Sequence, residues 1–217
     1  MDLAQYKTLV FDCDGVILDS NLLKTQAYYD TAIAFGASHE QAQAIVDYHV
    51  RLGGISRYPK FEYFLQEILH RPVTAESMTY LLDRFASEIH HGLLHCQLAD
   101  GLFELRERYP QQRWMVLSGG DQAELRELFK QRGLDIIFDG GIYGSPDNKD
   151  QVLAREIASG HLAKPALFLG DSKYDHEAAS RAGLDFLFLS EWTEFEGWQT
   201  YCQKHGIRIL TNLGSLS

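Results

Sequence analysis

Two aspartates, Asp12 and Asp14, stand one residue apart directly after the apolar run 8–11. This run is too short for a helix and is typical of a buried strand, after which Gly15 lets the backbone turn away. Because alternate side chains of a strand share a face, both aspartates can point beyond the sheet edge while Cys13 points toward the interior. Two carboxylates this close repel each other unless a cation offsets them, and Mg²⁺ binds one or two carboxylates together with water and substrate phosphate. The spacing therefore predicts an acidic, cation-dependent site.

Polar residues also follow two later apolar runs, at 114–117 and 166–169. These residues, together with a lysine that lies between the two runs, are Ser118, Gly119, Lys149, Asp171 and Asp175. Ligands of open parallel sheets bind beyond the carboxyl ends of the strands, so we expect these side chains to meet at one edge. Each feature by itself is common in surface turns or at helix starts. Their joint occurrence in this order favours a functional site.

The chemistry that these residue types complement is phosphoryl transfer. The carboxylate of Asp12 can attack phosphorus and form an aspartyl-phosphate, which divides one difficult displacement into two easier ones. Asp14 can protonate the leaving oxygen and then activate the attacking water, if its environment keeps its pKa near the working pH. We therefore predict Asp12 as the nucleophile and Asp14 as the general acid and base.

The same residues offer ligands for the metal and for the phosphate. Asp171 would complete the Mg²⁺ shell with Asp12 and the backbone carbonyl of Asp14, and Asp175 is a further candidate ligand. Two polar groups and one cation are predicted to bind phosphate oxygens and neutralise their charge. They are the Ser118 hydroxyl, the backbone N–H groups near Gly119 and the ammonium group of Lys149.

The elements that must position these residues alternate along the second half of the chain. Short apolar runs predict strands, and the amphipathic stretches between them predict helices. The expected strands are 8–11, 114–117, 136–138, 166–169, 186–189 and 207–210. The expected helices are 102–109, 123–132, 151–158 and 176–182. Strands of unbroken apolar residues alternating with helices are typical of a parallel sheet that is covered on both faces, so we predict an α/β fold.

The first half of the chain has a different pattern. Predicted helices follow one another there, and no segment shows the alternation of apolar and polar residues that is typical of a strand. The expected helices are 20–36, 38–52, 60–69 and 74–91. We therefore predict a helical domain, residues 19–96, inserted after the first strand of a core domain that comprises residues 1–18 and 97–217. Aromatic residues of this helical domain are expected to pack in its interior rather than to form a substrate platform. They are Tyr58, Phe61, Tyr63 and Phe64.

Composition limits the partners of the protein. The formal net charge of −10 argues against broad nucleic-acid binding, which needs a basic face. No apolar run is long enough to span a membrane, and the first residues lack the pattern of a secretory signal. Three widely spaced cysteines do not form a disulfide framework, so a cytoplasmic location is expected. The sequence leaves the oligomeric state open.

Four segments, 11–16, Ser118, Lys149 and 170–175, resemble the four signature motifs of the haloacid dehalogenase superfamily in the right order. The resemblance is to its phosphatase branch, which includes phosphoglycolate phosphatases and β-phosphoglucomutase-like proteins, with a helical C1-type cap. It implies a Rossmann-like core whose active site the cap closes. It also implies that Asp12 is the nucleophile, Asp14 the acid and base, and Asp171 a metal ligand, with Asp175 at a position that is a ligand in some members.

The motifs also separate branches of that superfamily. Dehalogenases lack a carboxylate at the position of Asp14. The phosphonate-cleaving relatives use a lysine of the cap in their reaction. Lys24 and Lys60 lie in the corresponding region here, but neither has a sequence context that identifies it as that lysine. The stretch 52–57 resembles a cap loop of the β-phosphoglucomutase type, in which the counterpart of Arg57 binds a second phosphate. Lys24, however, replaces the histidine of those mutases, and the stretch 144–149 departs from their Lys-Pro-x-Pro pattern.

The resulting prediction is a Mg²⁺-dependent phosphatase that hydrolyses a small phosphorylated metabolite, for example a sugar phosphate, through an aspartyl-phosphate at Asp12. A phosphomutase of the β-phosphoglucomutase type is the alternative enzyme. The non-enzyme alternative is a module that binds a phosphometabolite without turning it over, which predicts that a catalytic position has been lost. No such position is missing from the motifs.

Overall fold

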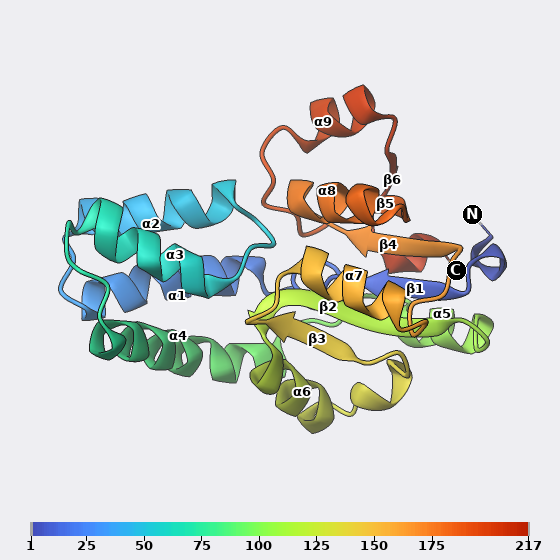
Figure 1. Ribbon diagram of the computed structural model, residues 1–217, viewed down its shortest axis with the longest axis horizontal. Helices are drawn as coiled ribbons and strands as arrows, with labels where there is room; N and C mark the ends of the chain where they lie inside the picture. The colour runs from blue at the N-terminus through green and yellow to red at the C-terminus, as the bar shows by residue number, and fades with distance from the viewer. Residues whose placement is uncertain (1, 217) are drawn as a thin grey trace.

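The computed structural model describes residues 2–216, and within them the chain forms a parallel sheet of six strands in the order β3-β2-β1-β4-β5-β6 (Figure 1). The strands are β1 Thr8–Phe11, β2 Arg113–Asp121, β3 Ile142–Ser145, β4 Ala166–Gly170, β5 Asp185–Leu189 and β6 Arg208–Leu210. The central strand β1 pairs with β2 on one side and with β4 on the other. The predicted α/β, Rossmann-like fold is therefore confirmed.

Helices cover both faces of the sheet, as the unbroken apolar strands predict. They are α5 Leu102–Arg108, α6 Gln122–Gln131, α7 Lys149–Ala158 and α8 Lys173–Ala182. Leu9 and Phe11 of β1 belong to the same apolar cluster as the buried leucines of α5 and α6. Val10, which points to the opposite face, belongs to the cluster that contains the buried residues of α7 and α8.

A block of helices lies between β1 and β2 in the sequence and beyond the carboxyl ends of the strands in space (Figure 1). Its helices are α1 Asn21–Ala34, α2 His39–Arg51, α3 Arg57–Tyr63, which continues as a π-helical turn over Phe64–Ile68, and α4 Ala75–His95. The side chains of Ser38 and Thr74 accept hydrogen bonds from the first turns of α2 and α4 and so fix where these helices begin.

Aromatic rings fill the interior of this helical block. Phe61 and Phe64 are fully buried, and the ring of Phe61 lies 5.3 Å from that of Tyr28 and 5.7 Å from that of Phe85. Tyr63 stacks on Tyr48 at a centroid distance of 3.7 Å. The expected interior packing is thus confirmed for Phe61 and Phe64, whereas Tyr63 is half-buried and Tyr58 is half-buried with its hydroxyl directed to Asp121 of the sheet domain.

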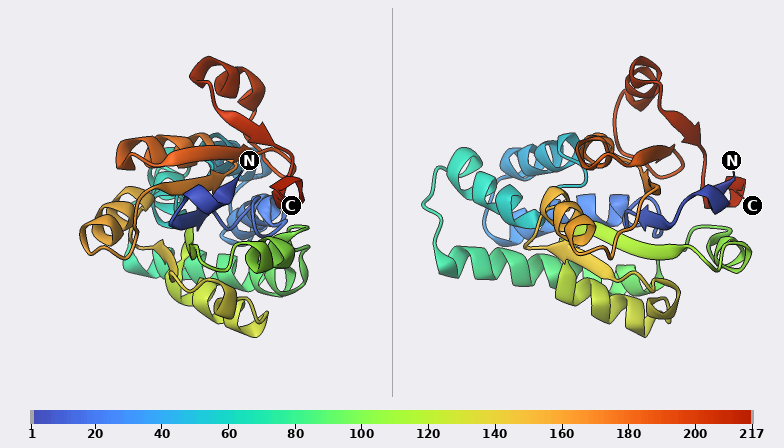
Figure 2. Two further views of the ribbon diagram at one scale, coloured as in Figure 1. Left: turned by 90° about the vertical axis from the view of Figure 1, so that its right-hand side faces the viewer. Right: turned by 45° about the vertical axis from the view of Figure 1, so that its right-hand side comes forward.

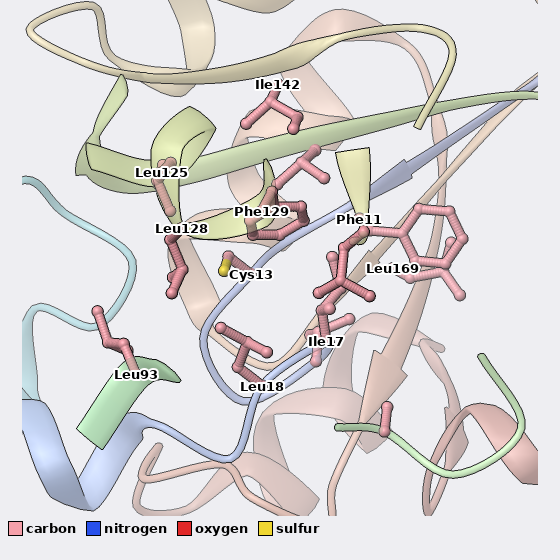
Figure 3. Packing of buried hydrophobic residues seen from close by; sticks show 14 of the residues in the cluster. Phe11, Cys13, Ile17, Leu18, Leu93, Leu125, Leu128, Phe129, Ile142 and Leu169 are labelled. Atoms are coloured by element: carbon pink, nitrogen blue, oxygen red, sulfur yellow. The ribbon is translucent and has the colours of Figure 1, made fainter. Parts of the chain in front are cut away.

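The apolar core continues from the sheet into the helical block. Figure 3 shows Leu93 of α4 on the same side of the core as Leu125 and Leu128 of α6 and Leu18 of the segment after β1. Cys13, which is fully buried, lies among these apolar residues as expected. The block therefore packs on the sheet domain through apolar contacts rather than through polar groups alone.

The two segments that connect the helical block to the sheet run side by side. Leu18 and Leu98 form an antiparallel bridge, flanked by hydrogen bonds from Ala99 N to Ile17 O at 2.9 Å and from Asp19 N to Gln97 O at 3.0 Å. The block therefore leaves and rejoins the sheet domain at one two-stranded junction.

One predicted strand is wrong. Residues 136 and 137 belong to a 3₁₀ turn over Asp135–Ile137 that ends before Phe138, and the strand that pairs with β2 is Ile142–Ser145. Ile136 is 80% exposed, so this apolar run does not enter the sheet. Three apolar residues do not distinguish a strand from a helical turn, because their periodicity is too short to read.

The last part of the chain adds α9 Trp198–His205 and the edge strand β6, the latter as predicted. Short 3₁₀ turns over Leu3–Gln5 and Leu213–Leu216 lie near each other, at the end of the sheet remote from the helical block (Figure 2). Among the described helices, none has both the length and the apolar character needed to span a lipid bilayer.

Replacing Phe61 by alanine is expected to lower the free energy of unfolding by about 3–5 kcal/mol, because a large ring is lost from a closely packed interior. Urea denaturation measures this change. Leu22→Ala is the matched control: Leu22 is 73% exposed, so its truncation should change the free energy of unfolding by less than about 0.5 kcal/mol. Equal effects of the two substitutions would contradict the packing described for the block.

Candidate active site

Three carboxylates converge at the carboxyl ends of the adjacent strands β1 and β4. Asp12 directly follows β1, Asp171 directly follows β4, and Asp175 lies in the first turn of α8. One oxygen of each lies within 4.8 Å of the others, and none of the three residues is more than 5% exposed. The neighbouring strands thus bring together residues that are about 160 positions apart in the sequence.

Lys149, the first residue of α7, holds two of these carboxylates. Its Nζ donates to Asp12 Oδ1 at 2.8 Å and also contacts Asp175 Oδ1, and the side chain is 1% exposed. Burial opposes the charge of Lys149, but Asp12 and Asp175 outweigh burial and raise its pKa. Lys149 is therefore a permanently charged ammonium group in the middle of the acidic cluster.

A single ammonium group does not balance the three carboxylates. Burial, followed by the charge of Asp175, raises the pKa of Asp12 to about 7 even though Lys149 acts in the opposite direction. Burial and the charges of Asp12 and Asp175 raise the pKa of Asp171 well above its usual range. Clustered oxygen donors with excess negative charge are the donor set that a hard divalent cation requires. The residues present therefore fit a divalent metal.

Asp14 has a different environment, although it is only two residues from Asp12. Its Oδ2 is 2.5 Å from Lys24 Nζ, and its Oδ1 accepts a hydrogen bond from Ser20 Oγ at 2.6 Å. Burial opposes ionisation, but Lys24 and Ser20 together lower the pKa of Asp14. The sequence prediction required a pKa near the working pH, and in this arrangement Asp14 is instead held as a carboxylate.

Glycine is required where the chain turns under the carboxylates. Gly15 has φ of +76°, a left-handed conformation that residues with a side chain rarely adopt. A Cβ atom at Gly15 would also collide with Asp171 Oδ2. The turn after Asp14 therefore depends on a residue without a side chain.

The predicted phosphate-binding residues lie at the end of β2. Ser118 is 1% exposed, and its hydroxyl accepts a hydrogen bond from Gly120 N at 3.0 Å and lies 3.5 Å from Asp14 Oδ2. Gly119 lies beneath the loop that joins α2 to α3. A Cβ atom at Gly119 would come within 2.7 Å of Gly54 O, so this contact requires glycine.

A cavity of about 920 Å³ separates the helical block from the carboxyl ends of the strands. Residues of the sheet domain and residues of the helical block line it from opposite sides. From the sheet domain they include Asp12, Asp14, Gly119 and Asp171, and from the block they include Lys24, Tyr28, His49, Arg57, Lys60 and Phe85. Ser118, Lys149 and Asp175 are buried, none more than 1% exposed.

Polar contacts hold the block against the sheet domain. Arg57 forms an ion pair with Glu124 of α6 and lies over the ring of Phe85, 5.3 Å from its centroid. Tyr58 OH donates to Asp121 Oδ2 at 3.1 Å. Nη1 of Arg57 is buried and has no hydrogen-bond partner among residues 2–216. Arg57 is therefore at the cavity wall but is already engaged with a carboxylate of the sheet domain.

Comparison with known families accounts for this arrangement. The model of the family described as haloacid dehalogenase-like hydrolase matches residues 6–183. The chain belongs to the haloacid dehalogenase-like hydrolases. A search of curated proteins found no match.

Solved structures share the fold of this haloacid dehalogenase-like hydrolase at low sequence identity. One, described as a predicted phosphoglycolate phosphatase from Haemophilus somnus 129PT, is 17% identical with a TM-score of 0.74, and the match covers 99% of this chain and 98% of that one. A predicted phosphatase from Clostridium acetobutylicum is also 17% identical with a TM-score of 0.74, over 97% and 96% of the two chains. A phosphonoacetaldehyde hydrolase like protein from Oleispira antarctica is 14% identical with a TM-score of 0.74, over 98% and 90%.

Several residues at the site of this hydrolase were not identified from the sequence. Asn21 donates to Asp171 Oδ2 at 2.8 Å, and Thr193 donates to Asp171 O at 2.5 Å. Glu194 accepts hydrogen bonds from Thr25 at 3.0 Å and lines the cavity. Thr193 and Glu194 follow β5, so the rule that polar residues beyond a strand gather at the site would have found them.

The raised pKa of Asp12 predicts a pH-dependent stability in the presence of a chelator. Between the ordinary carboxyl pKa of about 4 and the folded value of about 7, the folded protein binds a proton that the unfolded chain has released. The contribution of Asp12 to the free energy of unfolding therefore falls as the pH rises through this window and is constant above it. Urea denaturation at several pH values measures this slope.

The control for this measurement is Asp12→Asn, which cannot titrate at this position. His49 and other groups that Asp12 does not influence titrate in both proteins, so the difference between the two unfolding free energies reports Asp12 together with its effect on the pKa of Asp171. We expect the wild-type protein to lose stability relative to Asp12→Asn as the pH rises from 4 to 7. A difference that does not change across this window would contradict the described environment of Asp12.

Proposed function

We propose that this hydrolase is a phosphatase that hydrolyses phosphate monoesters of small metabolites through an aspartyl-phosphate at Asp12. The observation that carries the proposal is the convergence of buried carboxylates on one cavity between the helical block and the strand ends, with Lys149 buried beside Asp12. Proteins of the same fold that are described as a predicted phosphoglycolate phosphatase and a predicted phosphatase support the choice of reaction.

The first step is the attack of an Asp12 carboxylate oxygen on phosphorus. The bond between phosphorus and the ester oxygen breaks, and the leaving oxygen takes a proton from Asp14. Ser118 and the backbone N–H groups near Gly119 would hold the other phosphate oxygens, while Lys149 neutralises charge beside Asp12. In the second step Asp14 removes a proton from water, which attacks the phosphorus and releases phosphate, so that Asp12 is restored.

The ion pair with Lys24 limits when Asp14 can carry that proton. While Lys24 Nζ lies 2.5 Å from Asp14 Oδ2, the carboxylate is stabilised in its charged form. The proposed acid step therefore requires Lys24 to move away from Asp14 or to pass a proton to it as the ester oxygen develops charge.

The proposed cofactor is Mg²⁺. Asp12, Asp171 and Asp175, with the backbone carbonyl of Asp14, would hold it, because their oxygens are hard donors with excess negative charge. When bound, the ion would shield the negative charges of nucleophile and phosphate from each other and stabilise the charge of the transition state.

The enclosure of the cavity favours small substrates. We propose that residues 19–96 form a helical cap domain and that residues 1–18 and 97–217 form the core domain, because α1 to α4 all lie between β1 and β2. A cap in contact with the core through Arg57 and Tyr58 would exclude bulk water and large partners such as nucleic acids.

All cysteines are free thiols, as expected for a reducing compartment such as the cytoplasm.

The alternatives have weaker support. A phosphomutase of the β-phosphoglucomutase type needs Arg57 to bind a second phosphate, and the ion pair with Glu124 competes for its guanidinium group. A module that only binds a phosphometabolite does not require a nucleophile, an acid and a metal site in one place. Hydrolysis of the monoester uses all of these groups.

Asp12→Asn is expected to reduce phosphate release from p-nitrophenyl phosphate by at least about a thousandfold, because the nucleophile is removed while its shape is kept. The wild-type protein should lose activity in a chelator and recover it when Mg²⁺ is added back. Asp83→Asn, on the exposed surface of α4, is the matched control and should retain activity. Activity that survives Asp12→Asn or the chelator would overturn the mechanism.

A further inference from the structure

Lys60 is a buried amine on the helical side of the cavity. It belongs to α3, is 1% exposed and lines the same cavity as Asp12 and Asp14. Its Nζ lies 2.8 Å from His49 Nδ1 and 5.7 Å from the centroid of the Tyr28 ring. In the sequence, Lys60 has no context that distinguishes it from the other lysines.

No carboxylate among residues 2–216 pairs with Lys60. Three other cations at or beside the cavity are different, because Lys24 pairs with Asp14, Arg57 with Glu124 and Lys149 with Asp12. Arg51 and Lys173 also line the cavity, but both are exposed, so water can solvate their charges. A buried ammonium group without a counter-charge is unfavourable, and lysine responds by giving up its proton. Burial and the charge of Lys24 accordingly lower the pKa of Lys60 to about 7.

Charges of both signs face Lys60 from the surrounding elements. Asp14 and Glu194 favour its ammonium form, whereas Lys24 and Lys149 oppose it. Burial and the nearby Lys60 and Lys24 lower the pKa of His49 well below its usual value, so the imidazole is neutral and accepts the hydrogen bond. One donor of the ammonium group is thereby used, and two remain for a ligand in the cavity.

We propose that Lys60, supported by His49, is a second binding subsite that takes a carboxylate of the substrate, so that the substrates are phosphate monoesters of small hydroxy acids. This inference rests on the proposed function, because the phosphate is assigned to the opposite side of the cavity, at Asp12 and Lys149. The carboxylate supplies the counter-charge that the protein itself does not provide, and it makes the buried ammonium group favourable.

The charge balance favours a carboxylate over the other groups that a substrate can carry. A second phosphate would place a dianion opposite one buried, unpaired cation and near Asp14 and Glu194, leaving a buried negative charge. A neutral hydroxyl or an apolar group would leave the ammonium group without a counter-charge. A sugar phosphate without an acid group is therefore a poorer substrate than a phosphorylated acid of similar size.

The test compares two phosphate monoesters that differ at the far end. In 3-phosphoglycerate this end is a carboxylate, and in glycerol 3-phosphate it is a neutral hydroxymethyl group. We expect the wild-type protein to show a kcat/KM about 10- to 100-fold higher for the acid, the range expected for a hydrogen-bonded charge pair. Lys60→Met should reduce this ratio toward one, mainly through the KM of the acid, and Lys60→Arg should restore part of it.

Lys130→Met is the matched control, because it removes the same charge from the exposed surface of α6 and should leave the substrate ratio unchanged. Binding to the Asp12→Asn protein, measured by titration calorimetry with Mg²⁺ present, separates the subsite from catalysis. There too, 3-phosphoglycerate should bind more tightly than glycerol 3-phosphate, and the difference should vanish when Lys60→Met is added.

The outcomes distinguish the two proposals. Hydrolysis of p-nitrophenyl phosphate with equal kcat/KM for the two glycerol-based esters would overturn the subsite and leave the phosphatase in place. An absence of hydrolysis, together with tighter binding of the acid that depends on Lys60, would overturn the phosphatase and support the subsite. Equal binding of both esters to the Asp12→Asn protein would overturn the subsite whether or not Lys60→Met folds.

Discussion

The repulsion between Asp12, Asp171 and Asp175 is the constraint around which this molecule is built. Two unit charges 4 Å apart interact by about 4 kcal/mol at an effective dielectric constant of 20. The protein nevertheless places these carboxylates within 4.8 Å of one another and almost out of contact with water. Lys149 offsets part of the repulsion, and glycine at position 15 gives Asp171 the room to approach. The negative charge that Lys149 does not offset favours the binding of a cation at this site.

The environment also gives two neighbouring aspartates opposite properties. Asp12 is surrounded by other carboxylates and its pKa is raised, whereas Asp14 is paired with Lys24 and its pKa is lowered. The difference comes from elements that are remote in sequence, since Lys24 belongs to the helical block and Asp175 to the last part of the sheet domain. The position of the block therefore sets the electrostatics of Asp14 as well as the access to the cavity.

The sequence was informative where chemistry follows local rules. Asp12 and Asp171 could be placed at one edge because each follows an apolar run of strand length, and Lys149 could be placed beside them because it opens a helix of the same α/β unit. The strand predicted at 136–138 is wrong, since three apolar residues fit a helical turn as well as a strand. Lys60 could not be interpreted either. The role proposed for Lys60 depends on the absence of a carboxylate paired with it, and tertiary packing between segments far apart in the chain determines that absence.

The junction at Leu18 and Leu98 bears on how such a protein can diversify. Both ends of the helical block meet there as neighbouring, hydrogen-bonded strands, so the order of strands in the sheet does not depend on what lies between them. The block is therefore an insertion that can be replaced without changing the sheet. A different insertion would bring a different set of cavity-lining groups to an unchanged reaction centre. Substrate selectivity can then change through substitutions in the block while the residues of the reaction centre stay the same.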